Sequence, residues 1–462
     1  MEKKAKTFKE GGIAYRLFKS YIRFFHDRIY YRRTYSLQKE NIPPPGTPLM
    51  IVSNHQNCLN DPLGVLFSFR DRKPYFIARA DVFDYHQLFG KFLRSIGMLP
   101  AFRIDYEGEA ALHKNKDTFI LSEYELVNGC TLVMYPEAGH QDKRWLGDFS
   151  YGYTKMVFEA AALDNFQTEI FILPSCNHYS DYFRMREQFL VKFGTPISIK
   201  PFYELYQTKP RTAQRQVSAL VRKQIEELML NIRDLDNYEA IDFIRNTTFG
   251  KKFAAQHQFD AEKLPDRLLS DRLLVESLEK VKITGNEEAL HKIYADALML
   301  KKGIGEMKIN DALFERCPSW GLLIGYLLLL VLLFPLWVFS LWPNALNLIA
   351  PNFFINRMTD KMFYGTFVLT MSVLITIPIL YTLAFVLTWI LTNVWVALIH
   401  LASLPLLALF AWYYRKFLQT TMQALRFRIN FKTNILDDLK NLRAKLYDRL
   451  NELLPSESKN KN

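Results

Sequence analysis

Short apolar runs alternate with amphipathic stretches of helical length between about Pro43 and Pro201. The apolar runs predict strands at Leu49–Ser53, Tyr75–Arg79, Met98–Phe102, Thr131–Tyr135, Glu169–Pro174 and Phe189–Phe193. Segments between several of them, such as FDYHQLFGKFLRSIG, are long enough for helices. This alternation predicts an α/β domain built around a mostly buried sheet, which we place at residues 43–205.

The pattern changes after this domain. Residues 206–318 contain longer, charged amphipathic segments, for example PRTAQRQVSALVRKQIEELMLNI. Apolar positions at helical spacing among many charges are typical of helices with one buried face. We interpret this part as a helical accessory region with a structural role.

Two later stretches are apolar enough to enter a membrane. Residues 320–341 contain no charged side chain, and residues 363–414 contain none apart from His400, which is charged only when protonated. A helix needs about 20 residues to cross a bilayer, so the second stretch is long enough for two crossings. The sequence therefore predicts an integral membrane protein with a transmembrane region at 319–414.

Three prolines, Pro335, Pro343 and Pro351, fall in and just after the first apolar stretch. Because proline bends or ends a helix, we expect a bent hairpin that re-enters on the same side over about 320–356. The second stretch is expected to form a helical hairpin over about 363–412. This arrangement gives an even number of crossings.

Both ends of the chain are basic. The first 40 residues contain 11 Lys and Arg against 4 Asp and Glu, and residues 415–462 contain 11 against 5. We interpret residues 1–42 as a basic amphipathic segment lying on an anionic membrane surface; a helix packed on the protein body is the alternative. Residues 415–462 are expected to form a basic cytoplasmic helical tail, since the positive-inside rule places both ends there.

The net charge of +12 could also suggest a nucleic-acid partner, but the positive charge flanks apolar segments and no nucleic-acid module is recognisable. A lipid bilayer is the better partner. The cysteines show no paired spacing that would predict disulfides or a zinc site; they are Cys58, Cys130, Cys176 and Cys317. His140, Asp142, His178 and Asp181 do not match a familiar ligand pattern, so we predict no metal.

The first predicted strand leads into the polar sequence SNHQNCLND, which contains Asn54, His55 and Asp61. A histidine just after a strand can act as a general base near neutral pH, and a nearby carboxylate can orient it. A histidine beside an asparagine-rich turn is more often structural, so this stretch alone leaves both possibilities open.

Three further stretches follow in order. FIARADVFDYHQLFGKFLRSIGMLPAFR places Gly97 six residues before Arg103, TLVMYPEAGHQDKR places Glu137 after a strand, and EIFILPSCNHY carries Pro174. Together with SNHQNCLND, they resemble the four conserved blocks of the glycerolipid acyltransferase superfamily. The resemblance covers about residues 40–200 and implies a mixed sheet flanked by helices, followed by the helical and transmembrane regions.

The resemblance also implies site roles. His55 would be the general base and Asp61 its supporting carboxylate. The implied substrate-binding residues are Arg103 for the acceptor's phosphate, with Glu137, Gly139, Arg79, Asn54 and Pro174. A surface salt bridge is the alternative role for Arg79.

The sequence departs from the family pattern at two places. Five residues separate His55 from Asp61 where four are usual, and Asn60 occupies the usual aspartate position. One residue turns a side chain by roughly 100° on a helix, so Asp61 can serve only if the turn holds one extra residue. In the third block, Ala138 replaces a glycine and His140 stands where a hydroxyl or arginine is common.

These features predict a membrane-bound O-acyltransferase without a cofactor. Acyl-CoA or acyl carrier protein would donate a fatty acyl chain to glycerol 3-phosphate or 1-acylglycerol 3-phosphate. The expected location is a bacterial inner membrane, with the catalytic domain on the cytoplasmic side. The alternatives are a lysophospholipid or aminolipid remodelling acyltransferase and a non-catalytic lipid-binding or scaffold protein.

Overall fold

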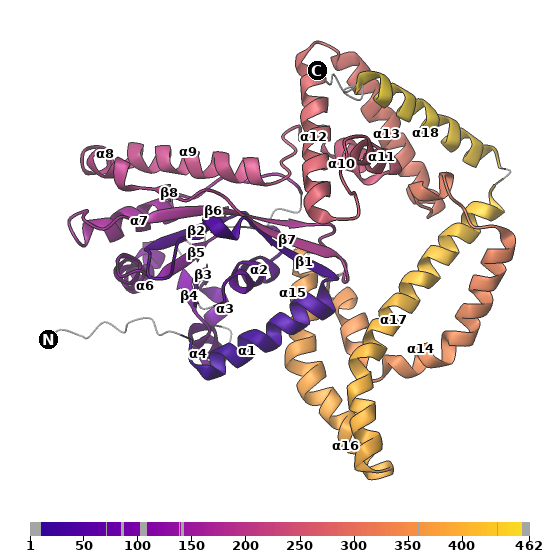
Figure 1. The fold of residues 1–462 in the computed structure, drawn as a ribbon, viewed down its shortest axis with the longest axis horizontal. Helices are drawn as coiled ribbons and strands as arrows, with labels where there is room; N and C mark the ends of the chain where they lie inside the picture. Colours follow the sequence, from indigo (N-terminus) through magenta and orange to yellow (C-terminus); the bar gives the residue numbers. More distant parts are fainter. Residues whose placement is uncertain are drawn as a thin grey trace. The chain divides into compact units, whose positions relative to one another are not determined.

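The computed structural model describes residues 11–70, 72–84, 87–101, 109–137, 139, 143–355, 357, 361–431 and 433–454. The chain divides into two compact units (Figure 1). The first, which we call the sheet unit, contains Met1–Asn231 together with Met358–Leu369. The second, the helical unit, contains Ile232–Arg357 and Thr370–Asn462.

The sheet unit contains an eight-stranded mixed sheet in the order β1-β7-β6-β2-β5-β3-β4, with β8 paired to β6. Pairs involving β2, and the β1–β7 and β3–β4 pairs, are parallel, whereas β6 runs antiparallel to β7 and β8. The strands are β1 Arg33–Leu37, β2 Leu49–Ser53, β3 Tyr75–Arg79, β4 Met98–Ala101, β5 Thr131–Met134, β6 Phe171–Tyr179, β7 Gln188–Phe193 and β8 Ile197–Ser198.

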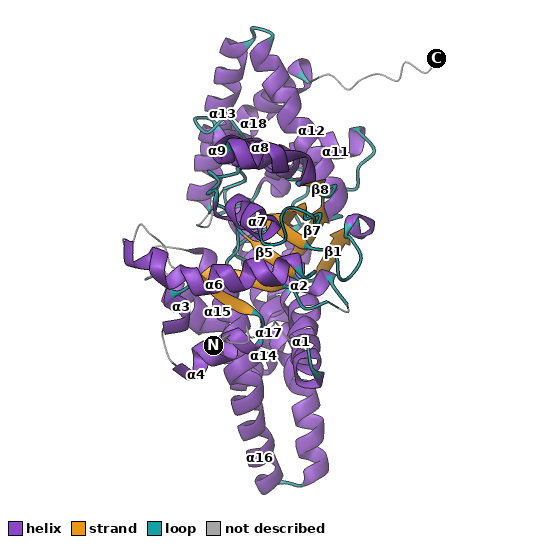
Figure 2. Cartoon of the chain, turned by 90° about the vertical axis from the view of Figure 1, so that its left-hand side faces the viewer, coloured by secondary structure: helices purple, strands orange, loops and turns teal. Residues whose placement is uncertain are grey.

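Helices cover the sheet, whose strands are orange in Figure 2. They are α1 Ile13–Phe24, η1 Phe25–Tyr30, η2 Lys39–Asn41, α2 Asn60–Ser68, α3 Asp81–Asp84, α4 Gln87–Ser95, α6 Glu109–Val127, α7 Gly152–Ala162, η3 Lys200–Phe202, α8 Tyr203–Thr208 and α9 Pro210–Leu228. A late segment, η5 Lys361–Phe363 with the start of α15 Tyr364–Thr370, belongs to the same unit.

The two faces of the sheet bury alternate residues of β2, as the period of a strand requires. Met50 and Val52 join a core with α7 and α9, which lie on one face (Figure 1). On the other face α2 packs closely on β7. A Cβ on Gly64 would lie 2.2 Å from Cζ of Phe189 and 2.9 Å from Cγ2 of Val191, so only glycine permits this approach.

The six predicted strands are present with small changes at their ends. The fifth continues through Pro174 to Tyr179, because its second half pairs with β7 after its first half has paired with β2. β1, which lies in the predicted segment 1–42, and the two-residue β8 were not predicted. β1 consists of exposed and half-buried residues at the sheet edge and is mostly polar, so it lacks the apolar run that identified the others.

Helix α1 is amphipathic and packed on one side. Lys19 Nζ donates to the carbonyl of Phe69 at 2.7 Å, and the rings of Phe18 and Phe92 meet edge to face with centroids 5.5 Å apart. Ile13, Leu17 and Phe24, by contrast, are exposed. Packing on the protein body therefore leaves an apolar stripe of α1 uncovered by the described residues.

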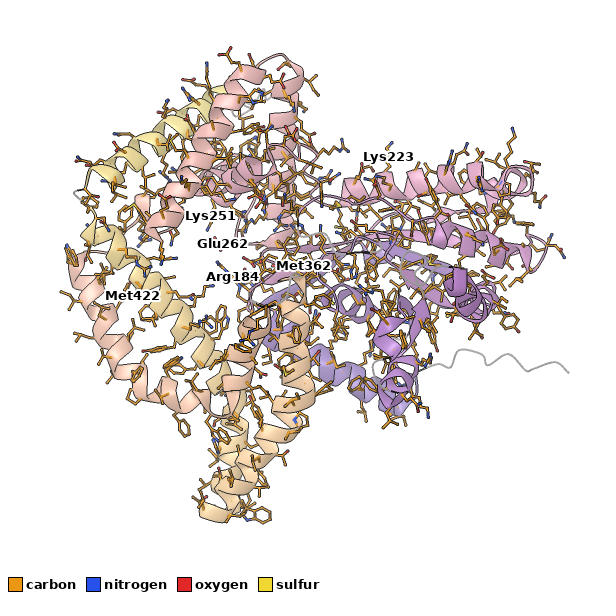
Figure 3. The ribbon with its side chains drawn as sticks, turned by 180° about the vertical axis from the view of Figure 1, so that it is seen from behind. Arg184, Lys223, Lys251, Glu262, Met362 and Met422 are labelled. Carbon is orange, nitrogen blue, oxygen red and sulfur yellow. The ribbon has the colours of Figure 1, made fainter. Side chains whose placement is uncertain are left out.

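The helical unit begins with α10 Tyr238–Asn246, α11 Thr248–Gln256, α12 Leu264–Ile283, α13 Glu287–Met307 and η4 Asp311–Phe314. The C-terminal helix α18 Asn434–Leu453 packs on α13, where a Cβ on Gly303 would lie 2.4 Å from Cδ2 of Leu439. An exposed ion pair, Lys251 Nζ to Glu262 Oε1 at 2.8 Å, joins α11 to the segment before α12 (Figure 3).

Three helical segments among the described residues are long and apolar enough to cross a membrane: Trp320–Ala350, Tyr364–Leu391 and Val394–Ile429. They comprise α14 Trp320–Ile355, α15 with η6 Met371–Tyr381 and α16 Thr382–Leu391, and α17 Val394–Ile429. α14 has non-helical dihedral angles at Trp342 and Pro343, where the sequence predicts a bend, whereas Pro335 lies within regular helix.

The predicted helical hairpin is formed by α16 and α17. The side chain of Asn393 accepts hydrogen bonds from the N–H groups of Trp395 and Val396 and so caps the second helix. Within the helical unit, Tyr381 packs against Leu404 and donates to Oδ1 of Asn344 in α14 at 2.8 Å. Polar groups between apolar helices thus satisfy one another.

Asp311 ties three parts of the helical unit together. Its Oδ1 accepts from Arg443 Nε at 2.7 Å, and its Oδ2 accepts from the N–H of Thr248 at 2.7 Å and the hydroxyl of Tyr447 at 2.9 Å. Burial alone would raise the pKa of Asp311, but the hydrogen bonds from Arg443 and Thr248 outweigh it and lower that pKa below its usual value. The carboxylate is therefore held in its ionised form.

We predict that Asp311→Asn destabilises the chain in a pH-dependent way. A lowered pKa in the folded state stabilises the fold above about pH 3.9, the value for an unfolded aspartate, and this contribution disappears as the pH falls through the folded value. The variant should lose about 1–3 kcal/mol at pH 7 and progressively less towards about pH 3. Thermal unfolding of the detergent-solubilised chain measures the difference.

Asp437→Asn is the matched control, because Asp437 is an exposed α18 residue whose ion pair with Lys440 contributes little. A loss of stability in Asp311→Asn that is the same at every pH would contradict the assigned charge.

Candidate active site

The candidate site lies at one edge of the sheet, where β2 and β5 end and the longer β6 continues. β2 is parallel to both β5 and β6, so the carboxyl ends of β2 and β5 meet at the same edge. His55 follows β2, Glu137 follows β5, and the longer β6 reaches past them to Tyr179. Functional residues in such sheets commonly lie at this edge.

The structure brings His55 and Asp61 together. His55 Nδ1 lies 2.8 Å from Asp61 Oδ2, the Asp61 side chain is fully buried, and 19% of the His55 side chain is exposed. The His55 ring also stacks on Tyr135, with centroids 4.5 Å apart. With Nδ1 turned to the carboxylate, Nε2 is the ring nitrogen suited to receive a proton.

Asp61 accepts three further hydrogen bonds. The N–H groups of Gln56 and Asn57 donate to Oδ2 at 2.7 and 2.8 Å, and the hydroxyl of Tyr179 donates to Oδ1 at 2.5 Å. Complete burial raises the pKa of Tyr179 well above its usual value, so its phenol keeps its proton and acts as a donor. The sequence analysis missed Tyr179, although it lies five residues after Pro174 in the fourth block.

The extra residue between His55 and Asp61 is accommodated in the turn. Cys58 adopts a left-handed backbone conformation with φ +36°. Asn60, at the usual aspartate position, is fully buried and donates from its N–H to the carbonyl of Asn57 at 2.8 Å and from Nδ2 to Asn57 Oδ1 at 3.1 Å. This turn brings Asp61, and not Asn60, to the imidazole.

Glu137 holds the backbone of the same loop. Its Oε1 accepts from the N–H of His55 and its Oε2 from the N–H of Gly147, both at 2.7 Å. Burial raises the pKa of Glu137 to about 7, against the effect of these two donors. Its contacts fix the position of His55, while Gly139, two residues on, is exposed.

Asn54 and Pro174 brace β2 against β6. Asn54 Nδ2 donates to the carbonyl of Asn177 at 3.1 Å, and its Oδ1 accepts from the N–H of Asn177 at 2.7 Å. Pro174 pairs with Val52 in the sheet. Both residues are buried among protein atoms, so the substrate contact assigned to them stays a prediction.

The structure describes one of the two arginines that are predicted to bind phosphate. Arg79, at the end of β3, makes two contacts with Asp81: Nη2 to Oδ2 at 2.5 Å and Nε to Oδ1 at 3.2 Å. Both side chains are more than half exposed, which matches the surface salt bridge considered as the alternative. Arg103, with Ala138 and His140 of the third block, lies outside the described residues.

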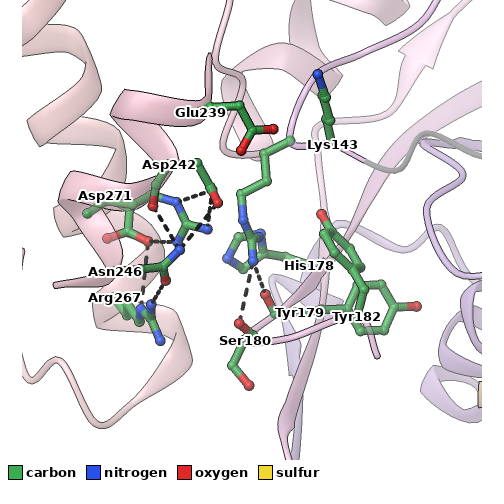
Figure 4. Close-up of polar contacts among 12 residues, drawn as sticks. Lys143, His178, Tyr179, Ser180, Tyr182, Glu239, Asp242, Asn246, Arg267 and Asp271 are labelled. Carbon is green, nitrogen blue, oxygen red and sulfur yellow. Dashed lines mark hydrogen bonds and ion pairs between the residues drawn. The ribbon is translucent and has the colours of Figure 1, made fainter. Parts of the chain in front are cut away.

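Two further side chains make hydrogen bonds around the site, one from the segment after β5 and one from the segment after β6. The buried Arg144 donates from Nη2 to the carbonyls of Tyr179 and Ser180, at 2.9 and 3.5 Å (Figure 4). The hydroxyl of Tyr182 donates to Gln56 Oε1 at 2.8 Å. Within the described part of the chain, no group of three or more His, Cys, Asp and Glu side chains could hold a metal ion.

Residues 34–177 match the family model described as Acyltransferase. A comparison with curated proteins gives no match. One solved structure, described as the 1-acyl-sn-glycerophosphate (LPA) acyltransferase PlsC from Thermotoga maritima, has 17% sequence identity, covers 46% of this chain and 81% of its own, and has a TM-score of 0.34.

The family match begins in β1 and ends at Asn177 in β6, and so includes His55, Asp61 and Glu137. It agrees with the resemblance drawn from the four sequence blocks and shows that this part of the chain is similar to the Acyltransferase family.

Proposed function

We propose that the protein is a membrane-bound O-acyltransferase of phospholipid biosynthesis. It transfers a fatty acyl chain from acyl-CoA or acyl carrier protein to a hydroxyl of glycerol 3-phosphate or 1-acylglycerol 3-phosphate. The observation that carries the proposal is the 2.8 Å contact between His55 Nδ1 and Oδ2 of the buried Asp61. The His55 side chain itself remains partly exposed.

The residues suggest a direct transfer. His55 Nε2 takes the proton of the acceptor hydroxyl as the oxygen attacks the thioester carbonyl, and Asp61 stabilises the imidazolium that forms. The tetrahedral intermediate then collapses, the carbon–sulfur bond breaks, and the imidazolium returns the proton to the leaving thiolate. A thioester is already activated, so no acyl-enzyme and no cofactor is required.

We propose that the chain is an integral protein of a bacterial inner membrane, with its catalytic domain on the cytoplasmic side. The three apolar helical segments and the exposed stripe of α1 support membrane attachment. We retain an even number of crossings, with residues 320–356 re-entrant, because both ends of the chain are basic. Acyl chains partition into the bilayer, so an enzyme at its surface meets its lipid substrates there.

A scaffold role would not require an oriented imidazole. The contact between His55 and Asp61, despite the longer spacing, favours catalysis over that alternative. Remodelling of lysophospholipids or aminolipids remains a second acceptor class. Purified protein incubated with labelled acyl-CoA or acyl carrier protein and each acceptor in turn separates these possibilities; transfer to none of them would overturn the proposal.

We predict that His55→Ala lowers the rate of acyl transfer by about 10²–10⁴-fold, the range expected for loss of a general base. His291→Ala is the control, because His291 is an exposed histidine of α13. Transfer of labelled acyl chains and thermal unfolding of both variants provide the measurements. Full activity in a folded His55→Ala variant would exclude His55 as the base.

We predict that Tyr179→Phe reduces kcat/KM roughly threefold to tenfold at neutral pH, because one hydrogen bond to Asp61 is lost. Acyl-transfer rates and thermal unfolding of the purified variant measure the effect.

Tyr31→Phe is the matched control for this effect. Tyr31 is equally buried, its ring centroid lies 6.2 Å from that of Tyr179, and its hydroxyl has no hydrogen-bond partner among the described residues. Wild-type kcat/KM in a folded Tyr179→Phe variant would mean that the phenol acts by packing alone.

A further inference from the structure

A short segment far along the chain belongs to the sheet unit. Residues 358–369 are separated in sequence from the rest of that unit by residues 232–357, yet they are grouped with it by their contacts. Three of its side chains are almost completely buried: Met362, which is labelled in Figure 3, Val368 and Leu369. The segment opens the apolar span Tyr364–Leu391, so one end of this span is anchored in the sheet unit.

Thr366 contacts the loop that carries the catalytic pair. Its Oγ1 accepts a hydrogen bond from the N–H of Leu59 at 3.1 Å. Leu59 is the residue before α2, and its own side chain is apolar and cannot cap the helix. The N–H group of this capping residue receives its oxygen acceptor from a residue 307 positions away.

Gly365 allows the backbone of α15 to reach the same loop. A Cβ at this position would lie 2.2 Å from Nδ2 of Asn60 and 3.2 Å from Oδ1 of Asn57, the two atoms that bond to each other across the turn. It would also lie 2.8 Å from the hydroxyl of Tyr30. Any larger side chain must displace the Asn60 side chain, and with it the hydrogen bond to Asn57, or must shift the helix.

We infer that Gly365 and Thr366 are positioning residues of the active site, which hold the turn between His55 and Asp61 in the geometry that catalysis requires. This inference rests on the proposed function. The turn contains one residue more than is usual, so it needs an outside constraint, and displacement of reacting groups by about 1 Å can cost roughly 10²-fold in rate. α15 supplies that constraint through one hydrogen bond and one close backbone contact.

Four variants of the full-length protein in detergent micelles test the inference. Gly365→Ala should lower kcat at least tenfold, and Thr366→Val about threefold to tenfold, with the KM for the soluble acyl donor unchanged. Thr366→Ser keeps the hydroxyl and should recover most of the activity. Gly325→Ala is the control for the glycine change, because a Cβ there meets no atom within 4 Å.

Hydrogen–deuterium exchange gives a readout independent of turnover. In Thr366→Val, the peptide containing Leu59 should exchange faster than in the wild-type chain. In Thr382→Val it should not, because the Thr382 hydroxyl bonds only to Pro378 of its own helix among the described residues. This comparison also decides the inference if Gly365→Ala does not fold.

Wild-type kcat in folded Gly365→Ala or Thr366→Val, or unchanged exchange at Leu59, would overturn the inference. A wild-type chain that acylates no acceptor would overturn the proposed function instead, and the exchange comparison would still report whether Thr366 holds the loop.

Discussion

The carboxylate of Asp61 is fully buried, and a buried charge must be given hydrogen-bond donors by the fold. Four groups donate to it: the imidazole of His55, two backbone N–H groups of the turn, and the phenol of Tyr179. The turn therefore folds around the carboxylate. The extra residue is accommodated in this turn, where Cys58 adopts a left-handed conformation.

The sheet brings the partners of this turn together from distant parts of the sequence. Parallel pairing of β2 with β5 brings Glu137 to the N–H of His55, and pairing of β2 with β6 lets Asn54 bond to Asn177. β6 then extends beyond its partner β2 and places Tyr179 over Asp61. Glu137 and Asn54, which are predicted to contact substrate, hold the loop and β6 in place through their side-chain polar atoms.

Much of the fold follows from local pattern. Six strands could be predicted because they form apolar runs, and His55 with Asp61 could be identified because polar residues follow such a run. β1 was missed because this edge strand, RTYSL, is mostly polar. Tyr179 was missed because an aromatic residue in a strand looks like core, and its hydrogen bond depends on tertiary pairing. No local pattern could reveal a contact between Leu59 and Thr366.

The sheet unit is interrupted in sequence by residues 232–357. A ribosome makes the chain from the amino terminus, so all eight strands leave it well before Gly365 and Thr366 exist. During that interval the turn between His55 and Asp61 lacks the acceptor for Leu59. The turn receives this acceptor only after α14 has been synthesised, so the order of translation delays assembly of the candidate active site until the first apolar helix has emerged.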